Sequence, residues 1–436
     1  MNKNHTLSKF SKYVSLNVLG MIGLSCYILA DTFFVANALG ANGLAALNFS
    51  ISIYSIIHGT GLMIGIGGAT RYSILKAQGE HDKANAIFSH AIVSGIVLGL
   101  FYLLIGIFFT KPLASLLGAD SSTLPLTVTY LSTILCFSPF FILNNIMLAF
   151  VRNDHQPKLS MAAMITGSLS NIVLDYIFIF PLSMGMFGAA FATGLAPIIS
   201  MGILSLHFIY KRHQFKFIRC KFQISRFIDI LSLGLSAFIT EVSSGIVLII
   251  FNLTILKLEG NIGVAAYGIV ANIALVAIAV FTGVAQGIQP IVSKGYGSND
   301  KLMLKQVLRY ALATSLLFAL LVYAVTFFYS TGIIAVFNKD KDPILAALAR
   351  EGLSIYFVGF FFAGINIVTA AFLSATEKAT KAFFISILRG CVVIIPFVLV
   401  LSSIWKMNGI WLSFVVCEFL VSIISVIIMK QKKKEI

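Results

Sequence analysis

The stretch GIGGATRYSILKAQGEHDK at residues 65–83 has a counterpart about 220 residues later, GVAQGIQPIVSKGYGSNDK at residues 283–301. The residues that the two stretches share in register include Gly65 with Gly283, Gly79 with Gly297, Asp82 with Asp300, and Lys83 with Lys301. LGANGLAA (39–46) likewise precedes the first stretch as EGNIGVAA (259–266) precedes the second. Three more matches keep the order: 116–120 with 336–340, 145–146 with 366–367, and 186–190 with 407–411. Ordered matches at a nearly constant offset indicate a duplicated chain.

The composition is that of a membrane protein. Of the 436 residues 58% are hydrophobic and only 11% charged, whereas a soluble protein carries about 25% charged residues. A spanning helix needs about 20 mostly apolar residues. Twelve runs meet this length: 14–38, 44–70, 87–109, 125–150, 159–180, 187–210, 229–256, 264–291, 308–329, 352–373, 383–404 and 409–429.

The twelve runs and the duplication together predict the fold class: an all-α membrane protein of 12 transmembrane helices in two six-helix repeats. Because six is even, both repeats start on the same side of the membrane and are parallel. The expected domains are an N-terminal lobe (1–210), a basic linker (211–228), and a C-terminal lobe with a basic tail (229–436).

The basic residues predict the orientation. With the N-terminus inside, the tails and even-numbered loops hold 24 Lys and Arg residues and the odd-numbered loops hold six. The positive-inside bias therefore places both termini in the cytoplasm. The richest stretch, 211–226, has Phe215, Phe217 and Phe222 between its charges. Such a pattern can bind RNA, but in a linker on this face it favours an amphipathic segment against anionic lipid, with no nucleic acid partner.

Two acidic residues in the first half predict an ion-binding cluster. Asp31 and Asp175 each lie about 8–10 Å below the outer edge of the membrane at 1.5 Å per residue. Asn171 is one turn inward of Asp175 on the same face, and Thr193 reaches the same depth. Charged side chains inside a membrane are costly and usually functional. These oxygens suit a proton or, alternatively, a sodium ion; the other interpretation is polar contacts that only hold helices together.

Two further acids lie near mid-membrane in the second half. Glu241 is about 12 residues into the seventh run, and Glu418 about nine into the twelfth. Both are candidate substrate-binding residues, because carboxylates lining a cavity attract cations. For Glu418 a hydrogen bond to a neighbouring side chain is an equally good explanation.

Four segments also resemble the multidrug and toxic compound extrusion (MATE) transporters. They are ADTFFVANALGANGLAALNFS from Ala30, FVRNDHQPKLSM from Phe150, SNIVLDYIFIFPLSMGMFGAAFATG from Ser170 and VAQGIQPIVSKGYGSND from Val284. The resemblance covers nearly the whole chain. It implies a V-shaped, two-lobed exporter that alternates between inward and outward openings and is driven by cation antiport.

The resemblance also implies roles for individual residues. The coupling cluster of proton-driven bacterial members falls on Asp31, Asn171, Asp175 and Thr193, and the seventh-span Glu of some sodium-coupled members falls on Glu241. The chain departs from the family pattern in three places. Leu16-Asn17 and Ser236 stand where prolines are common, and no acid occurs between Phe360 and Phe372.

The expected function is multidrug efflux: cation-coupled antiport of amphipathic organic cations across the cytoplasmic (inner) membrane by a monomer. No catalytic residues, metal or cofactor other than the coupling ion, H⁺ or Na⁺, are expected, because the chain shows no catalytic spacing and no phosphate-binding loop. The alternative is a flippase or exporter of a lipid-linked precursor or another amphipathic metabolite. A cavity for a lipid-linked precursor should be basic. The intramembrane acids favour the cation exporter.

Overall fold

The computed structural model describes residues 3–338 and 341–431, and every regular element in those ranges is a helix. The tail lysines in the inner charge count, Lys432, Lys433 and Lys434, lie outside them. The first half contains α1 (Lys3–Ala77), α2 (His81–Phe108), α3 (Thr110–Leu116), α4 (Leu124–Cys136), α5 (Ser138–Asn153), α6 (Pro157–Ile179) and α7 (Gly185–Ile209). The second contains α8 (Ile224–Gly297), α9 (Lys301–Phe328), α10 (Ser330–Phe337), α11 (Pro343–Tyr356), η1 (Phe357–Gly359), α12 (Phe360–Ala375), α13 (Ala379–Ile387), η2 (Leu388–Val392) and α14 (Ile394–Gln431).

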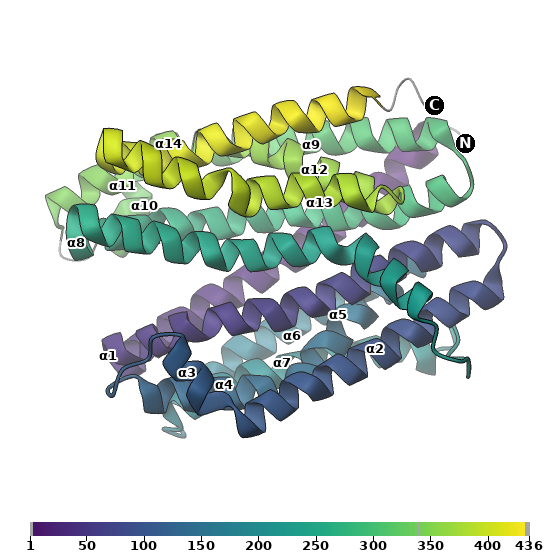
Figure 1. Ribbon diagram of the computed structural model, residues 1–436, viewed down its shortest axis with the longest axis horizontal. Coiled ribbons are helices and arrows are strands. Elements are labelled where there is room, and N and C mark those ends of the chain that lie inside the picture. Colours follow the sequence, from purple (N-terminus) through teal and green to yellow (C-terminus); the bar gives the residue numbers. More distant parts are fainter. Residues whose placement is uncertain (1–2, 339–340, 432–436) are drawn as a thin grey trace.

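The helices form two bundles that lie side by side along their long axes (Figure 1). Eight stretches of the described chain are long and apolar enough to cross a membrane, and the pair α4 and α5, bent by 49°, makes a ninth. Three of the stretches turn sharply at non-helical residues, in α1, α8 and α14. If each of these three counts as two crossings, the described residues contain the twelve predicted crossings, six in each half.

The turns in α1 and α8 occur at equivalent positions of the repeat. Gly40 has φ 64° and ψ −154°, and Gly260 has φ 63° and ψ −152°. This backbone conformation is open to glycine but strained for residues with a Cβ atom. The two halves therefore use the same turn at the same place.

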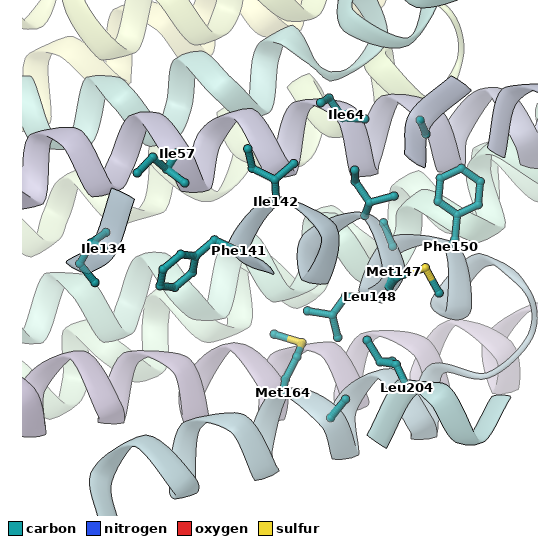
Figure 2. Packing of buried hydrophobic residues seen from close by; sticks show 14 of the residues in the cluster. Ile57, Ile64, Ile134, Phe141, Ile142, Met147, Leu148, Phe150, Met164 and Leu204 are labelled. Carbon is teal, nitrogen blue, oxygen red and sulfur yellow. The ribbon is translucent and has the colours of Figure 1, made fainter. Parts of the chain in front are cut away.

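Each bundle has its own apolar core. Figure 2 shows part of the N-terminal one, where Ile57 and Ile64 of α1 meet Ile142 and Phe150 of α5. The second core is centred on α8, α12 and α14 and includes the fully buried Trp411. The start of α1 does not follow this division, because Phe10 and Val14 pack among apolar residues of α8, α9 and α12 (Figure 1).

The two bundles pack most closely near the end of the molecule where the described chain begins and finishes, called here the terminal end (Figure 1). In α1 and α8, Gly67 lies directly against the carbonyl oxygen of Ile230, and Gly234 lies against that of Met63. No side chain fits between these backbones. An ion pair between Arg71 and Glu377 joins the bundles at the same end.

The linker between the bundles is extended and attached to the N-terminal bundle. Phe215 is fully buried against the rings of Tyr72, Phe88 and Phe150. The backbone N–H of Gln214 donates to Asp154 Oδ2 at 2.7 Å. The prediction of a lipid-facing segment is therefore wrong for Phe215, because aromatic neighbours distant in sequence provide a buried site for its ring. Phe217 and Phe222 remain exposed.

Candidate functional site

The four residues predicted to form an ion-binding cluster lie together inside the N-terminal bundle. Asp31 of α1 is 6% exposed, and Asp175 of α6 is fully buried. Their two carboxyl groups interact electrostatically with each other. Asn171 and Thr193, from α6 and α7, are also buried. The depth estimate from the helical rise therefore placed these residues near their true neighbours.

The Asn171 side chain joins Asp175 to α7. When its amide nitrogen faces Asp175, it donates to Oδ2 at 3.0 Å, and its oxygen accepts from the backbone N–H of Thr193 at 3.2 Å. We assign this orientation because the reverse one places the amide oxygen against acceptors alone. Oδ1 of Asp31 and Oδ1 of Asp175 have no hydrogen-bond partner in the described chain. Buried carboxyl oxygens without donors are suited to a small cation.

Tyrosines that the sequence analysis did not single out surround this cluster. Tyr130 of α4 interacts electrostatically with both Asp31 and Asp175. The hydroxyl groups of Tyr27 and Tyr54, both in α1, are 2.9 Å apart. The Tyr54 ring stacks on that of His58, with centroids 5.7 Å apart. Tyr27 and Tyr54 also line the space between the two bundles. An uncharged residue in an apolar run gives no sequence signal for such a position.

Glu241 lies at the interface between the two bundles. Its carboxylate in α8 is 3.2 Å from Nδ1 of His58 in α1. The pair does not have hydrogen-bond geometry, since Nδ1 of His58 has no hydrogen-bond partner. We therefore describe it as a close electrostatic contact. The Glu241 side chain remains 33% exposed, so a ligand can reach it.

A cavity of about 210 Å³, called here the central cavity, lies between the bundles. Its walls come from α1, α5, α6, α7 and α8, and include the aromatic rings of Tyr27, Tyr54 and Phe141. Glu241, His58 and Thr193 also line it. Thr193 therefore belongs both to the cavity wall and to the carboxyl cluster. Apolar walls with a few polar groups are typical of sites for small organic molecules.

Glu418 occupies a different place from the other predicted site residues. It is 2% exposed and pairs with Arg389 at 2.7 Å. Its second oxygen accepts from the Asn366 amide at 2.7 Å, and it is not part of the central cavity. The carboxylate is thus satisfied within the C-terminal bundle. This environment favours the hydrogen-bonded interpretation of Glu418 over substrate binding.

Arg152 and Asn153, at the end of α5, connect the two bundles through hydrogen bonds to α8. Arg152 falls between the predicted runs 125–150 and 159–180, in a stretch expected to be a loop, but it lies in the last turn of α5, is 2% exposed and lines the cavity. Asn153 donates to Gln289 of α8 at 2.8 Å, and Gln289 donates to Thr70 at 2.8 Å. Long-range packing buries this arginine, which the hydropathy of its own segment does not indicate.

A second cavity, of about 260 Å³, opens at the terminal end. Lys9, Lys76 and Lys294 line it, and none of the predicted site residues does. Burial and the nearby charge of Lys294 lower the pKa of His155 at its edge. This second cavity is therefore separate from the candidate site.

Comparison with known proteins gives consistent matches along the chain. A sequence model of the family described as MatE matches residues 18–177 and 236–400. The chain is 27% identical over 428 residues to the multidrug export protein MepA of Staphylococcus saprophyticus, covering 97% of this chain and 93% of that protein. It is 25% identical over 414 residues to MepA of Staphylococcus aureus MRSA252, covering 94% and 90%.

Solved structures match the fold closely. A multidrug resistance MATE family transporter of the MOP superfamily in an outward-facing conformation superposes with a TM-score of 0.91 at 21% identity, covering 97% of this chain and 95% of that one. A variant of the Vibrio cholerae MATE transporter VcmN gives 0.90 at 20% identity, covering 100% and 98%. At these identities the likeness establishes the fold.

Proposed function

The chain belongs to the MATE family of transporters, and on that premise we propose that it exports amphipathic organic cations by cation-coupled antiport. The central cavity supports this proposal most directly. It has aromatic walls, it lies between two bundles related by duplication, and it contains the accessible carboxylate of Glu241. Aromatic faces and a carboxylate together attract flat organic cations. The curated relatives are named as multidrug export proteins.

We propose that the coupling ion, a proton or a sodium ion, binds at Asp31, Asn171, Asp175 and Thr193. Two buried carboxyl groups at close range repel each other when both are ionised, and a bound cation relieves that repulsion. The hydroxyl of Tyr54 is 2.9 Å from that of Tyr27, and the Tyr54 ring stacks on His58, the neighbour of Glu241. Binding at the cluster is thus in a position to influence the cavity wall.

We propose that alternating access depends on the terminal end. The close packing of α1 on α8 and the Arg71–Glu377 pair close this end of the molecule. Opening it requires that these contacts separate. A coupling ion and a substrate that favour different states of this interface would drive exchange, because a ligand shifts an equilibrium only by its differential affinity.

The alternative of a flippase for a lipid-linked precursor has less support. A pyrophosphate group needs several basic residues around it. Arg152 is the one arginine that lines the central cavity among the described residues, and no lysine does. Glu241 would repel such a ligand.

The proposed drive is tested by efflux from proteoliposomes. A fluorescent organic cation inside the vesicles should leave faster when a proton gradient or a sodium gradient is imposed alone. We expect one of the two gradients to accelerate efflux at least about tenfold over vesicles without a gradient. Acceleration by neither gradient would contradict cation coupling, and ATP-dependent efflux would replace it with a different mechanism.

We also propose that the protein lies in the cytoplasmic membrane as a monomer, with lipid around its apolar faces and both termini inside. The native Cys220 in the linker is exposed. In a variant that lacks the other exposed cysteines, Cys26 and Cys136, an impermeant thiol reagent should label Cys220 only after permeabilisation. A cysteine introduced at Ser122 or Asn408 should be labelled in intact cells. The opposite pattern would reverse the orientation.

A further inference from the structure

Arg152 is a buried cation with no acidic partner. Its Nη1 donates to the side-chain oxygens of Asn17 at 3.0 Å and Gln286 at 2.9 Å. Its Nε is buried and donates to nothing. Among the described residues no carboxylate lies within salt-bridge distance of it, whereas Arg71 and Arg389 both pair with acids. Amide oxygens carry only partial charge, so the guanidinium charge is incompletely balanced.

The incompletely balanced charge of Arg152 lies in the wall of the central cavity. A charge removed from water is costly unless a partner of opposite charge compensates it. Arg152 lines the central cavity, so a ligand in the cavity can reach it. A guanidinium group offers parallel N–H donors that match the two oxygens of a carboxylate. The part of the cavity at Arg152 therefore offers the N–H donors and the positive charge that bind the carboxylate of an organic acid.

The opposite charge lies at the other end of the same cavity. Glu241 contacts His58, whose ring stacks on Tyr54, and Tyr54 packs against Phe141 of α5. Arg152 is eleven residues further along the chain, in α5. At 1.5 Å per residue this separation corresponds to about 16 Å along the axis. The cavity is therefore polarised, negative near Glu241 and positive at Arg152.

We propose that Arg152 binds a carboxylate of the exported compound, so that the preferred substrates are zwitterionic amphiphiles. The ammonium group lies near Glu241, the aromatic body lies against Tyr27, Tyr54 and Phe141, and the carboxylate lies at Arg152. This inference rests on the proposed export function and narrows its substrate class from cations to molecules that also carry an acid.

The test uses an amphipathic aromatic amine with a carboxylic acid at its far end, and the methyl ester of the same compound. The ester lacks the negative charge and otherwise differs only by one methyl group. Equilibrium binding to purified full-length protein is measured for both. Arg152→Gln should weaken binding of the acid by roughly 10- to 100-fold, the usual worth of a charge-assisted hydrogen bond, and should change ester binding by less than about threefold. Arg152→Lys should retain part of the preference for the acid.

The ratio of the two affinities protects the result against misfolding. Loss of folded protein reduces the number of sites for both ligands equally and leaves the ratio unchanged. Arg350→Gln is the control, because this exposed arginine of α11 lies outside the cavity and outside the contacts that close the terminal end. It should leave the ratio as in the wild type.

Four outcomes decide between the alternatives. A fall in the acid-to-ester ratio in Arg152→Gln alone supports carboxylate recognition. Equal weakening of both ligands, or of neither, overturns it and leaves Arg152 as a contact between the bundles. If the wild type binds the ester and Glu241→Gln weakens it, the proposed export function stands whatever Arg152 does. If the wild type binds neither compound, the proposed function fails and the inference fails with it.

Discussion

Asp31→Asn and Asp175→Asn should each abolish ion-driven efflux while the protein accumulates at nearly wild-type levels. Asparagine has almost the same shape as aspartate, so packing around these buried positions is retained. It cannot take up a proton or offer a full negative charge to sodium. Each carboxylate has an oxygen that accepts no hydrogen bond, so the amide NH₂ of asparagine can take that position without displacing an existing hydrogen bond.

The expected magnitude follows from the lost charge. A hydrogen bond to a charged group contributes about 1.5–3 kcal/mol, which corresponds to roughly a 10- to 100-fold loss of ion affinity. Efflux under the productive gradient should fall to the background rate, and its dependence on pH or sodium should flatten. Binding of the organic cation should survive, because Glu241 is unchanged.

Glu351→Gln provides the control for these variants. Glu351 is an exposed acid in α11, outside both the cluster and the cavity. It should transport as the wild type does. If both aspartate variants also retain gradient-driven efflux, the cluster is a structural contact between helices and the proposed coupling site is wrong.

Gly234→Ala should prevent closure of the terminal end and reduce transport at least about tenfold. A Cβ atom at Gly234 would collide with the carbonyl oxygen of Met63, which is backbone and cannot rotate away. Overpacking of this kind typically costs about 1–3 kcal/mol. Because each bundle keeps its own core, we expect the cost to fall on the closed state of the interface rather than on folding.

Two comparisons make this prediction specific. Gly67→Ala, which meets the carbonyl oxygen of Ile230 from the other side of the same contact, should have the same effect. Gly202→Ala in α7 meets nothing within 4 Å and should be neutral. Two quantities are measured for all three variants: the rate of efflux, and the reactivity of a cysteine introduced at the terminal end. Wild-type efflux in Gly234→Ala would show that closure does not depend on this contact.

The sequence alone determined that the protein lies in lipid, how many times it crosses the membrane, and that its two halves are a duplication. Few charges and long apolar runs require lipid, and helices that cross a bilayer have a nearly fixed length. The same constraint fixed the depth of a residue by its distance from a helix end. For this reason Asp31, Asn171, Asp175 and Thr193 could be grouped before any contact was known.

Tertiary structure alone decided which groups face each other across these helices. Depth does not specify the rotation of a helix or its partner in the other bundle. Glu418 therefore pairs with Arg389 within one bundle, whereas Glu241 meets His58 across the interface. Phe215 was expected against lipid and Arg152 in a loop, and each is buried by neighbours distant in the chain. Hydropathy reports the average environment of a segment, and a buried charge or an anchored ring is an exception that only long-range packing creates.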